Sequence, residues 1–134
     1  MSIASVEDRL AKPLEIAVEH ATAVDREARF PQEAIGALTD AGLLGLTIPE
    51  KQGGLGGGPS DFLTATRRIA AVDPSAAMIY LMHTCAAQVT IAGGAPDAVI
   101  SGMAGAELTT LAFSERGSRS HFWAPVSTVA GGTA

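Results

Sequence analysis

Cysteine and histidine, on which most disulfide and metal sites depend, are scarce in this sequence. Cys85 is the one cysteine among 134 residues, so no disulfide can form within the chain, and a reducing compartment such as the cytoplasm fits best. His20, His83 and His121 are scattered, and no His or Cys pair has the spacing of metal ligands. We therefore expect no metal site.

Aromatic and basic residues are also few. Aromatic residues make up 4 % of the chain, and 9 Lys and Arg face 14 Asp and Glu, for a net charge of −5. This balance lacks the basic surface that a phosphate backbone requires, so we expect no nucleic-acid partner. No signal peptide is expected, because Glu7, Asp8 and Arg9 come where an apolar run would stand. The hydrophobic share of 47 %, largely Ala and aliphatic residues, favours closely packed helices.

One long stretch has no charged residue at all. Residues 74–96 contain no Asp, Glu, Lys or Arg, and their number suffices to cross a bilayer. His83, Thr84 and Gln88 interrupt the run, however, and Ala supplies much of the rest. We therefore predict a helix buried inside a helical domain rather than a membrane span.

Apolar spacing and end signals predict five helices. The first is expected over residues 5–28, with Pro13 in its first turn and a true start near Ala11. A second should begin at Pro31 and end at Gly42, which fits a left-handed stop position. The other three are expected from a cap at Ser60 to about residue 71, from Asp73-Pro74 to Gly93-Gly94, and after Ala95-Pro96 with Val99, Ile100 and Met103 facing inward.

A glycine-rich segment over residues 52–59 suggests a phosphate-binding loop at first sight. No Lys-Ser or Lys-Thr pair follows at the required spacing, and no buried strand precedes it. The segment therefore predicts a tight turn between helices, in which glycine supplies positive φ angles.

The pattern changes near residue 107. Residues 108–113 are β-branched and apolar and predict a strand, and Val126 to Ala130 predict a second one. Two strands make no stable sheet by themselves. The expected fold class is thus mainly α: a helical domain over residues 1–106, followed over residues 107–134 by the truncated start of a β-domain.

Three features are candidates for chemistry. His83 interrupts an apolar helix and is either a hydrogen-bonded core histidine or a polar group lining a pocket. Cys85 lies two residues on and should point elsewhere, so we expect no Cys–His nucleophile and assign Cys85 to the core. Residues 111–120 are either a solvated loop or a site for a planar or phosphate-bearing ligand, with Arg116 and Arg119 supplying charge.

Four blocks, in order, resemble the N-terminal part of the acyl-CoA dehydrogenase family. They are Asp25 with Phe30-Pro31 and residues 41–46, then residues 48–56 with the Pro-Glu-x-x-Gly-Gly-x-Gly pattern, then residues 73–77 with His83, and last Ala112-Phe113-Ser114-Glu115 with Ser120. The last block lies where the family has its Thr-Glu-Pro-Gly-x-Gly-Ser-Asp flavin motif. The resemblance implies a helical domain, a β-barrel and a C-terminal bundle. It also implies a FAD enzyme that removes two hydrogens from the α and β carbons of an acyl thioester.

The resemblance also implies site residues. Ser114 stands for the motif threonine, which bonds the flavin pyrimidine edge, and Ser120 would approach both FAD and the thioester of the substrate. Leu111, Ala112 and Phe113 would run along FAD. Tyr80, His83, Thr84 and Ala87 would line the acyl-CoA pocket, an inference from one face of the helix expected over residues 74–94 rather than from a motif match. No catalytic base is expected in this chain, because the family's carboxylate base belongs to the C-terminal bundle.

Some positions depart from the family pattern. Arg116 stands in place of Pro, Arg119 in place of Gly and His121 in place of Asp. Two alternatives therefore stay open: a flavin monooxygenase of the same architecture, with His83 serving the flavin, and a non-catalytic helical interaction module. The resemblance covers about the first third of a family member. We expect this chain alone to be inactive, and the full-length protein to form a homo-oligomer.

Overall fold

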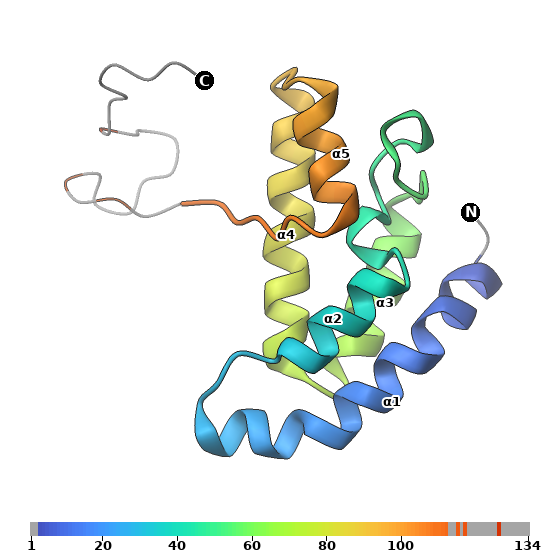
Figure 1. Cartoon of the computed structure of the whole chain (residues 1–134), viewed down its shortest axis with the longest axis vertical. Coiled ribbons are helices and arrows are strands. Elements are labelled where there is room, and N and C mark those ends of the chain that lie inside the picture. Colours follow the sequence, from blue (N-terminus) through green and yellow to red (C-terminus); the bar gives the residue numbers. More distant parts are fainter. Residues whose placement is uncertain (1–2, 113–114, 116, 118–125, 127–134) are drawn as a thin grey trace.

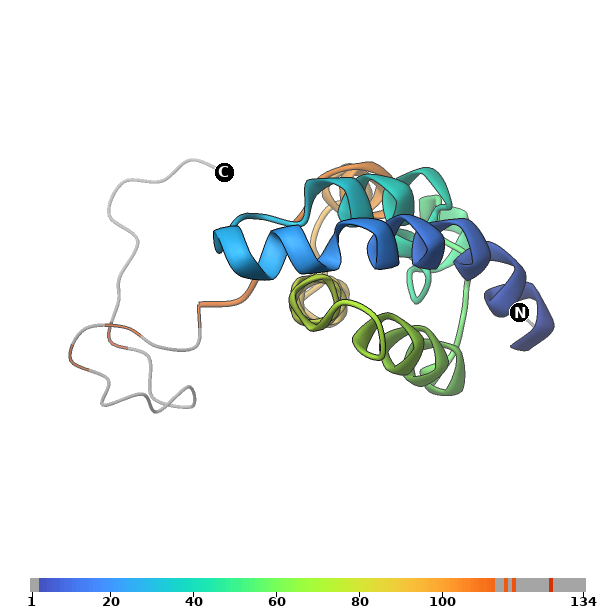
Figure 2. The same cartoon turned by 90° about the horizontal axis from the view of Figure 1, so that it is seen from below.

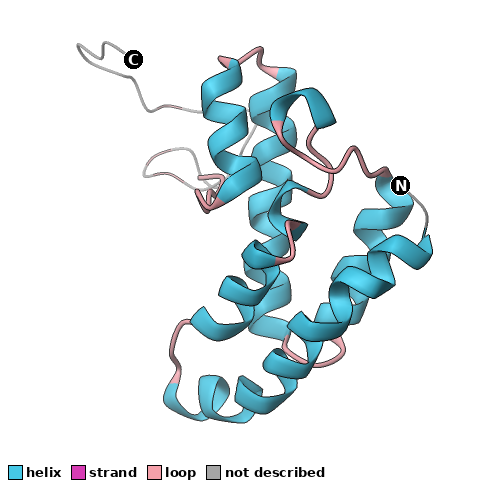
Figure 3. Ribbon diagram, turned by 45° about the vertical axis from the view of Figure 1, so that its right-hand side comes forward, coloured by secondary structure: helices cyan, strands magenta, loops and turns pink. Residues whose placement is uncertain are grey.

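The computed structural model describes residues 3–112 together with residues 115, 117 and 126, and this part of the chain is helical (Figures 1 and 3). Its elements are α1 (Ile3–Glu27), α2 (Gln32–Asp40), the 3-10 turns η1 (Leu43–Gly45) and η2 (Glu50–Gln52), α3 (Pro59–Ala70), α4 (Pro74–Ala92) and α5 (Asp97–Gly105). The predicted helical domain and its five α-helices are confirmed.

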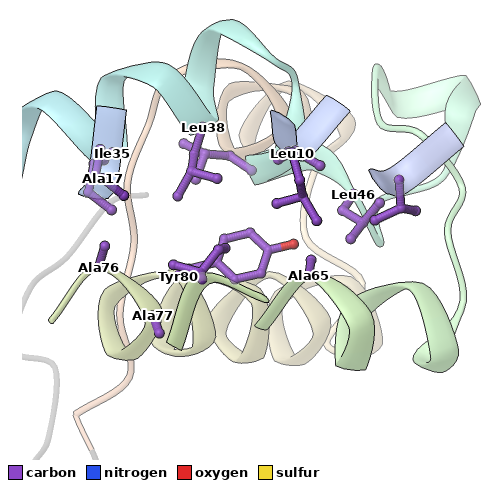
Figure 4. Close-up of a cluster of buried hydrophobic side chains, with 14 residues drawn as sticks. Leu10, Ala17, Ile35, Leu38, Leu46, Ala65, Ala76, Ala77 and Tyr80 are labelled. Carbon is purple, nitrogen blue, oxygen red and sulfur yellow. The ribbon is translucent and has the colours of Figure 1, made fainter. Parts of the chain in front are cut away.

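The helices form two layers (Figure 2). In one layer α1 packs against α2, and in the other α3 packs against α4, with α1 also contacting α3 across the gap. The main core lies between the layers and includes Leu10, Leu38 and Tyr80, while Ala65 and Ala76 allow the helices to approach closely (Figure 4). A second, smaller cluster joins α5 to α4 and contains Ile48, Ala87, Ile100, Met103 and Ala104.

The start of α1 differs from the prediction. The helix begins at Ile3, eight residues before Ala11, and Pro13 lies inside it. An internal proline costs about 3 kcal/mol because it removes one backbone hydrogen bond. Val6 and Leu10, both fully buried, lie upstream of Pro13, so the packing of this first part against the core outweighs that cost.

Helix ends follow the predicted signals with one correction. Gly42 adopts the left-handed φ of 72° after α2, and Asp73 caps α4 by accepting a hydrogen bond of 3.0 Å from the Ala76 amide. The cap of α3 is Gly58 rather than Ser60, which lies within the helix. The Gly58 amide donates to Asp61 Oδ2 at 2.8 Å, and Pro59 takes the first helical position, where its missing N–H costs nothing.

The C-terminal end of the described part also corrects the prediction. Residues 108–112 form no strand, because a strand requires a hydrogen-bonded neighbour and no other described segment pairs with them. Of the second predicted strand, Val126 is the one described residue, and the rest of that strand lies outside the described residues. In α5, Ile100 and Met103 face inward as predicted, but Val99 is 45 % exposed.

By length and composition α4 is the one described helix that could cross a membrane. It packs against α3, α5 and η1, and its polar residues His83 and Thr84 are buried. These contacts support the prediction of a domain helix, since a single apolar helix of this length also occurs in the cores of globular proteins.

Candidate functional site

An apolar groove of about 430 Å³ runs along α4. On one side stands α4 itself, and on the other the turn before α3 with the first residues of that helix. Leu111, the residue at which the predicted flavin-binding segment begins, also lines the groove. The full lining is Thr47, Gly57, Gly58, Pro59, Phe62, Thr84, Cys85, Gln88, Val89 and Leu111.

The chemistry of this groove is that of a binding surface. No charged side chain lines it among the described residues, and Thr47, Thr84 and Gln88 supply its polar groups. Two of them are engaged with one another, because Gln88 Nε2 donates to Thr47 Oγ1 at 2.9 Å. An apolar wall with a few polar groups is typical of sites for flat or chain-like organic ligands. Within the described residues no group of three or more His, Cys, Asp or Glu could hold a metal ion.

The glycine-rich turn forms one wall of the groove, and its amides point into the protein. Gly54 donates to the Pro49 carbonyl, Gly56 to that of Ile48 and Gly57 to that of Leu46, at 3.2, 2.9 and 2.7 Å. Gly53 and Gly56 have positive φ angles of 86° and 63°. The predicted structural turn is confirmed, since amides engaged in this way are not free to cradle a phosphate.

His83 is fully buried at the centre of α4 and bridges two other segments. Its Nε2 lies 3.2 Å from the carbonyl oxygen of Leu44 in η1, and the Thr109 amide donates to its Nδ1 at 3.2 Å. Burial lowers the pKa of His83, although the carbonyls of Leu44 and Met103 partly oppose this. His83 is thus a hydrogen-bonded interior histidine, which was one of the two interpretations left open.

The remaining predicted substrate residues on α4 lie in different places. Thr84 lines the groove and donates its hydroxyl to the Tyr80 carbonyl at 3.0 Å. Tyr80 lies in the main core (Figure 4). The centroid of its ring is 6.1 Å from that of the Phe62 ring. Burial raises the pKa of Tyr80. Ala87 belongs to the second cluster. A role of Tyr80, His83, Thr84 and Ala87 in substrate binding stays a prediction.

The predicted cofactor residues fall at the edge of the described structure. Leu111 is half-buried in the groove, and Ala112 is exposed. Phe113, Ser114 and Ser120 lie outside the described residues, as do Arg116, Arg119 and His121.

Sequence reasoning missed part of the groove. Cys85 is not a core residue as predicted, because it is half-buried and faces the groove. Gln88 and Val89 lie three and four positions further along the helix and share its face. This spacing was the signal that could have identified them. No sequence signal, in contrast, connected Thr47 with α4.

Comparisons with a family model and with curated relatives point to the same protein family. Residues 5–115 match the family model described as acyl-CoA dehydrogenase, N-terminal domain. Over 60 residues the chain is 40 % identical to the probable acyl-CoA dehydrogenase fadE25 of Mycobacterium leprae and 42 % identical to that of Mycobacterium tuberculosis. These 60 residues are 45 % of this chain and 15 % of each relative, so the match spans a small part of the relatives' length. No solved structure matches the chain significantly.

The family match runs from α1 through α5 to the segment that reaches the groove. It covers most of the chain, and it agrees with the observed helical fold. The chain therefore belongs to the acyl-CoA dehydrogenase family, of which it carries the N-terminal helical domain.

Proposed function

We propose that this chain is the N-terminal portion of a FAD-dependent acyl-CoA dehydrogenase-like oxidoreductase, which forms a double bond between the α and β carbons of an acyl thioester. One observation carries the proposal: the lining of an uncharged, apolar groove on α4 includes Leu111, the residue at which the predicted flavin-binding segment begins. The relatives are named acyl-CoA dehydrogenases, which supports the same substrate class.

The described residues fit FAD in this position. The backbone of residues 110–112 makes no hydrogen bond to other described residues, so its polar groups are free for a ligand. Leu111 and Ala112 are the described residues that would lie along FAD, continuing through Phe113 and Ser114 to Ser120. When bound, FAD supplies the acceptor for the β-hydrogen, which leaves the substrate as hydride.

The contribution of this chain is binding and orientation. Val89 and Phe62 offer apolar surface that excludes water from a bound acyl chain, and Thr84 lies on the same wall. The described lining contains no carboxylate that could remove the α-proton. The chain alone is therefore proposed to be inactive, with the base supplied by the C-terminal bundle of a longer cytoplasmic, homo-oligomeric protein. Residues 107–134 would begin its β-domain.

The structure does not favour the monooxygenase alternative. That alternative needs His83 to serve the flavin, but both ring nitrogens of His83 already have partners, Leu44 and Thr109. A non-catalytic interaction module would bind its partner through an apolar surface. The apolar groove on α4 is equally explained as a ligand site, so no separate observation favours the module.

The proposal is tested on the protein encoded by the complete reading frame and on the 134-residue chain. The complete protein should carry FAD, and anaerobic addition of acyl-CoA should bleach the visible absorbance of the flavin. The short chain should do neither. Oxygen-dependent hydroxylation of a substrate by the reduced flavin, without bleaching by acyl-CoA, would support the monooxygenase instead. If the reading frame ends at residue 134 and the protein binds no flavin, the non-catalytic interaction module would be the remaining interpretation.

A matched pair of variants links the activity to the groove. Val89 lines the groove and is 56 % exposed, whereas Val18 on α1 is 59 % exposed and lies away from it. Val89→Trp should fill the groove and raise KM for acyl-CoA, while Val18→Trp should leave KM unchanged. Equal effects of the two substitutions would show that the acyl chain binds elsewhere.

A further inference from the structure

The segment after α5 has few attachments to the rest of the domain. Between Gly105 and Ala112 it has no regular secondary structure, and it runs past α4 (Figure 1). Among the described residues, its amides make two hydrogen bonds with the helical body. Glu107 donates to the Gly102 carbonyl at 3.1 Å, and Thr109 donates to His83 Nδ1 at 3.2 Å. The first bond is local to α5, so His83 provides the attachment to α4.

This attachment defines the protonation state of His83. A backbone amide can only donate, so Nδ1 must be the unprotonated nitrogen of a neutral ring. The proton is then on Nε2, which donates to the Leu44 carbonyl at 3.2 Å. His83 therefore connects three elements at once: α4, on which it lies, η1 through Leu44, and the segment that carries Thr109.

The attached segment separates two grooves. Leu111 lines the groove described above, whereas Leu108, Thr109 and Thr110 line a second apolar groove of about 260 Å³ on α4. The two residues next to His83 in α4 also face different grooves: Thr84 lines the first groove and Met82 lines the second. The hydrogen bond between His83 and Thr109 thus joins residues that lie between the linings of the two grooves.

We propose that His83 is a positioning residue, whose neutral, Nε2-protonated imidazole holds Thr109 against α4 and so sets the place at which Leu111 closes the groove. The bond itself follows from geometry. Its consequence for flavin and acyl-thioester binding rests on the function proposed above. A proton on Nδ1 would oppose the Thr109 amide N–H and break that bond, leaving the Thr109 hydroxyl, 3.1 Å from Nδ1, as the remaining contact.

The surroundings of His83 determine how it responds to pH. In α4, the titratable groups near His83 along the chain are Tyr80, three residues before it, and Cys85, two residues after it; burial favours the neutral form of Tyr80. From η1 and α5 the ring is approached by the carbonyls of Leu44 and Met103, and no described charged side chain forms a hydrogen bond or an ion pair with it. Burial opposes protonation, so loss of the Thr109 amide bond is expected only below the ordinary histidine pKa of about 6.5.

Two substitutions remove the two hydrogen bonds of His83 one at a time. The carbonyl of an asparagine side chain can take the place of Nδ1, whereas the longer amide of glutamine can take the place of Nε2. His83→Asn should keep the Thr109 bond and lose the Leu44 bond, and His83→Gln should do the reverse. His20→Gln, on the surface of α1, is the matched control.

The readout is amide hydrogen exchange of Thr109 in the 134-residue chain. We expect about tenfold faster exchange in His83→Gln, as the loss of one hydrogen bond implies, and little change in His83→Asn or the control. Equal exchange in all variants would overturn the proposal. A second measurement needs no variant: nitrogen-15 shifts of the imidazole in the unsubstituted chain should show Nε2 protonated and Nδ1 not. The opposite tautomer would also overturn it.

The binding consequence is measured on the complete protein. His83→Gln should raise the dissociation constant for FAD or KM for acyl-CoA more than His83→Asn does, because only the former releases the segment before Leu111. If the complete protein binds neither ligand but Thr109 exchange still follows the predicted order, the proposed function fails and the positioning role stands. If ligands bind but both variants bind as the unsubstituted protein does, the positioning role fails.

Discussion

The carbonyl oxygen of Ile48 occupies the space that a side chain on Gly54 would need. Ile48 is fully buried, and its carbonyl accepts the Gly56 amide at 2.9 Å. A Cβ atom built on Gly54 would overlap this carbonyl. The close approach draws the glycine-rich turn onto the chain between η1 and η2, and so fixes one wall of the groove.

Replacing Gly54 by Ala should therefore destabilise the domain. The added methyl group meets backbone rather than a flexible side chain, and overpacking of this kind costs about 1–3 kcal/mol or more. Urea unfolding of the variant measures the loss. Gly36 in α2 is the matched control, because a Cβ there meets nothing within 4 Å. Gly36→Ala should stabilise the domain by about 0.5–1 kcal/mol. Equal effects at the two positions would contradict this account.

Asp73 should contribute as a helix cap. Its Oδ1 accepts the Ala76 amide at 3.0 Å, and Asp73→Ala removes this bond at a cost of about 1 kcal/mol. Asp73→Asn keeps a side-chain oxygen and should lose much less. The midpoint of urea unfolding distinguishes the two variants, and the same loss in both would show that the charge of Asp73 matters rather than its capping bond.

The hydroxyl of Tyr80 should add nothing to stability. It is buried and has no hydrogen-bond partner among the described residues. Tyr80→Phe removes it while keeping the ring against Phe62, so the free energy of unfolding should stay within about 0.5 kcal/mol or rise. Tyr80→Ala, which leaves a cavity, should cost about 3–5 kcal/mol. A loss above about 1 kcal/mol in Tyr80→Phe would reveal a partner for the hydroxyl.

Glu33 should make the fold sensitive to acid. The Arg29 guanidinium donates to its carboxylate at 2.8 Å and lowers the pKa of Glu33 to about 2. Since this value lies below that of the unfolded chain, the contribution is complete above about pH 4.5 and is lost as the pH falls toward 2. Glu33→Gln and Arg29→Met should both flatten stability against pH in this window. An unchanged slope in either variant would show that the pair does not carry the effect.

The sequence by itself determined the helical organisation, because its signals act locally. Gly42 ends α2 with its positive φ, and Asp73-Pro74 begins α4 through a bond to an amide three residues away. The apolar stripes placed Leu10 and Ala17 in the core. The four ordered sequence blocks identified the family, and recognising them required no knowledge of tertiary contacts.

Only the tertiary structure decided where the functional surfaces lie, because these depend on contacts between distant residues. Pro13 stays within α1 because Val6 and Leu10 pack against the core. Thr84 and Leu111 were expected near a ligand and do line one groove, but that groove also needs Thr47, which no local pattern connects to α4. His83 acquires its bonds from partners 39 and 26 residues away. A helical pattern indicates which face of α4 is apolar, but packing alone selects the element that each face meets.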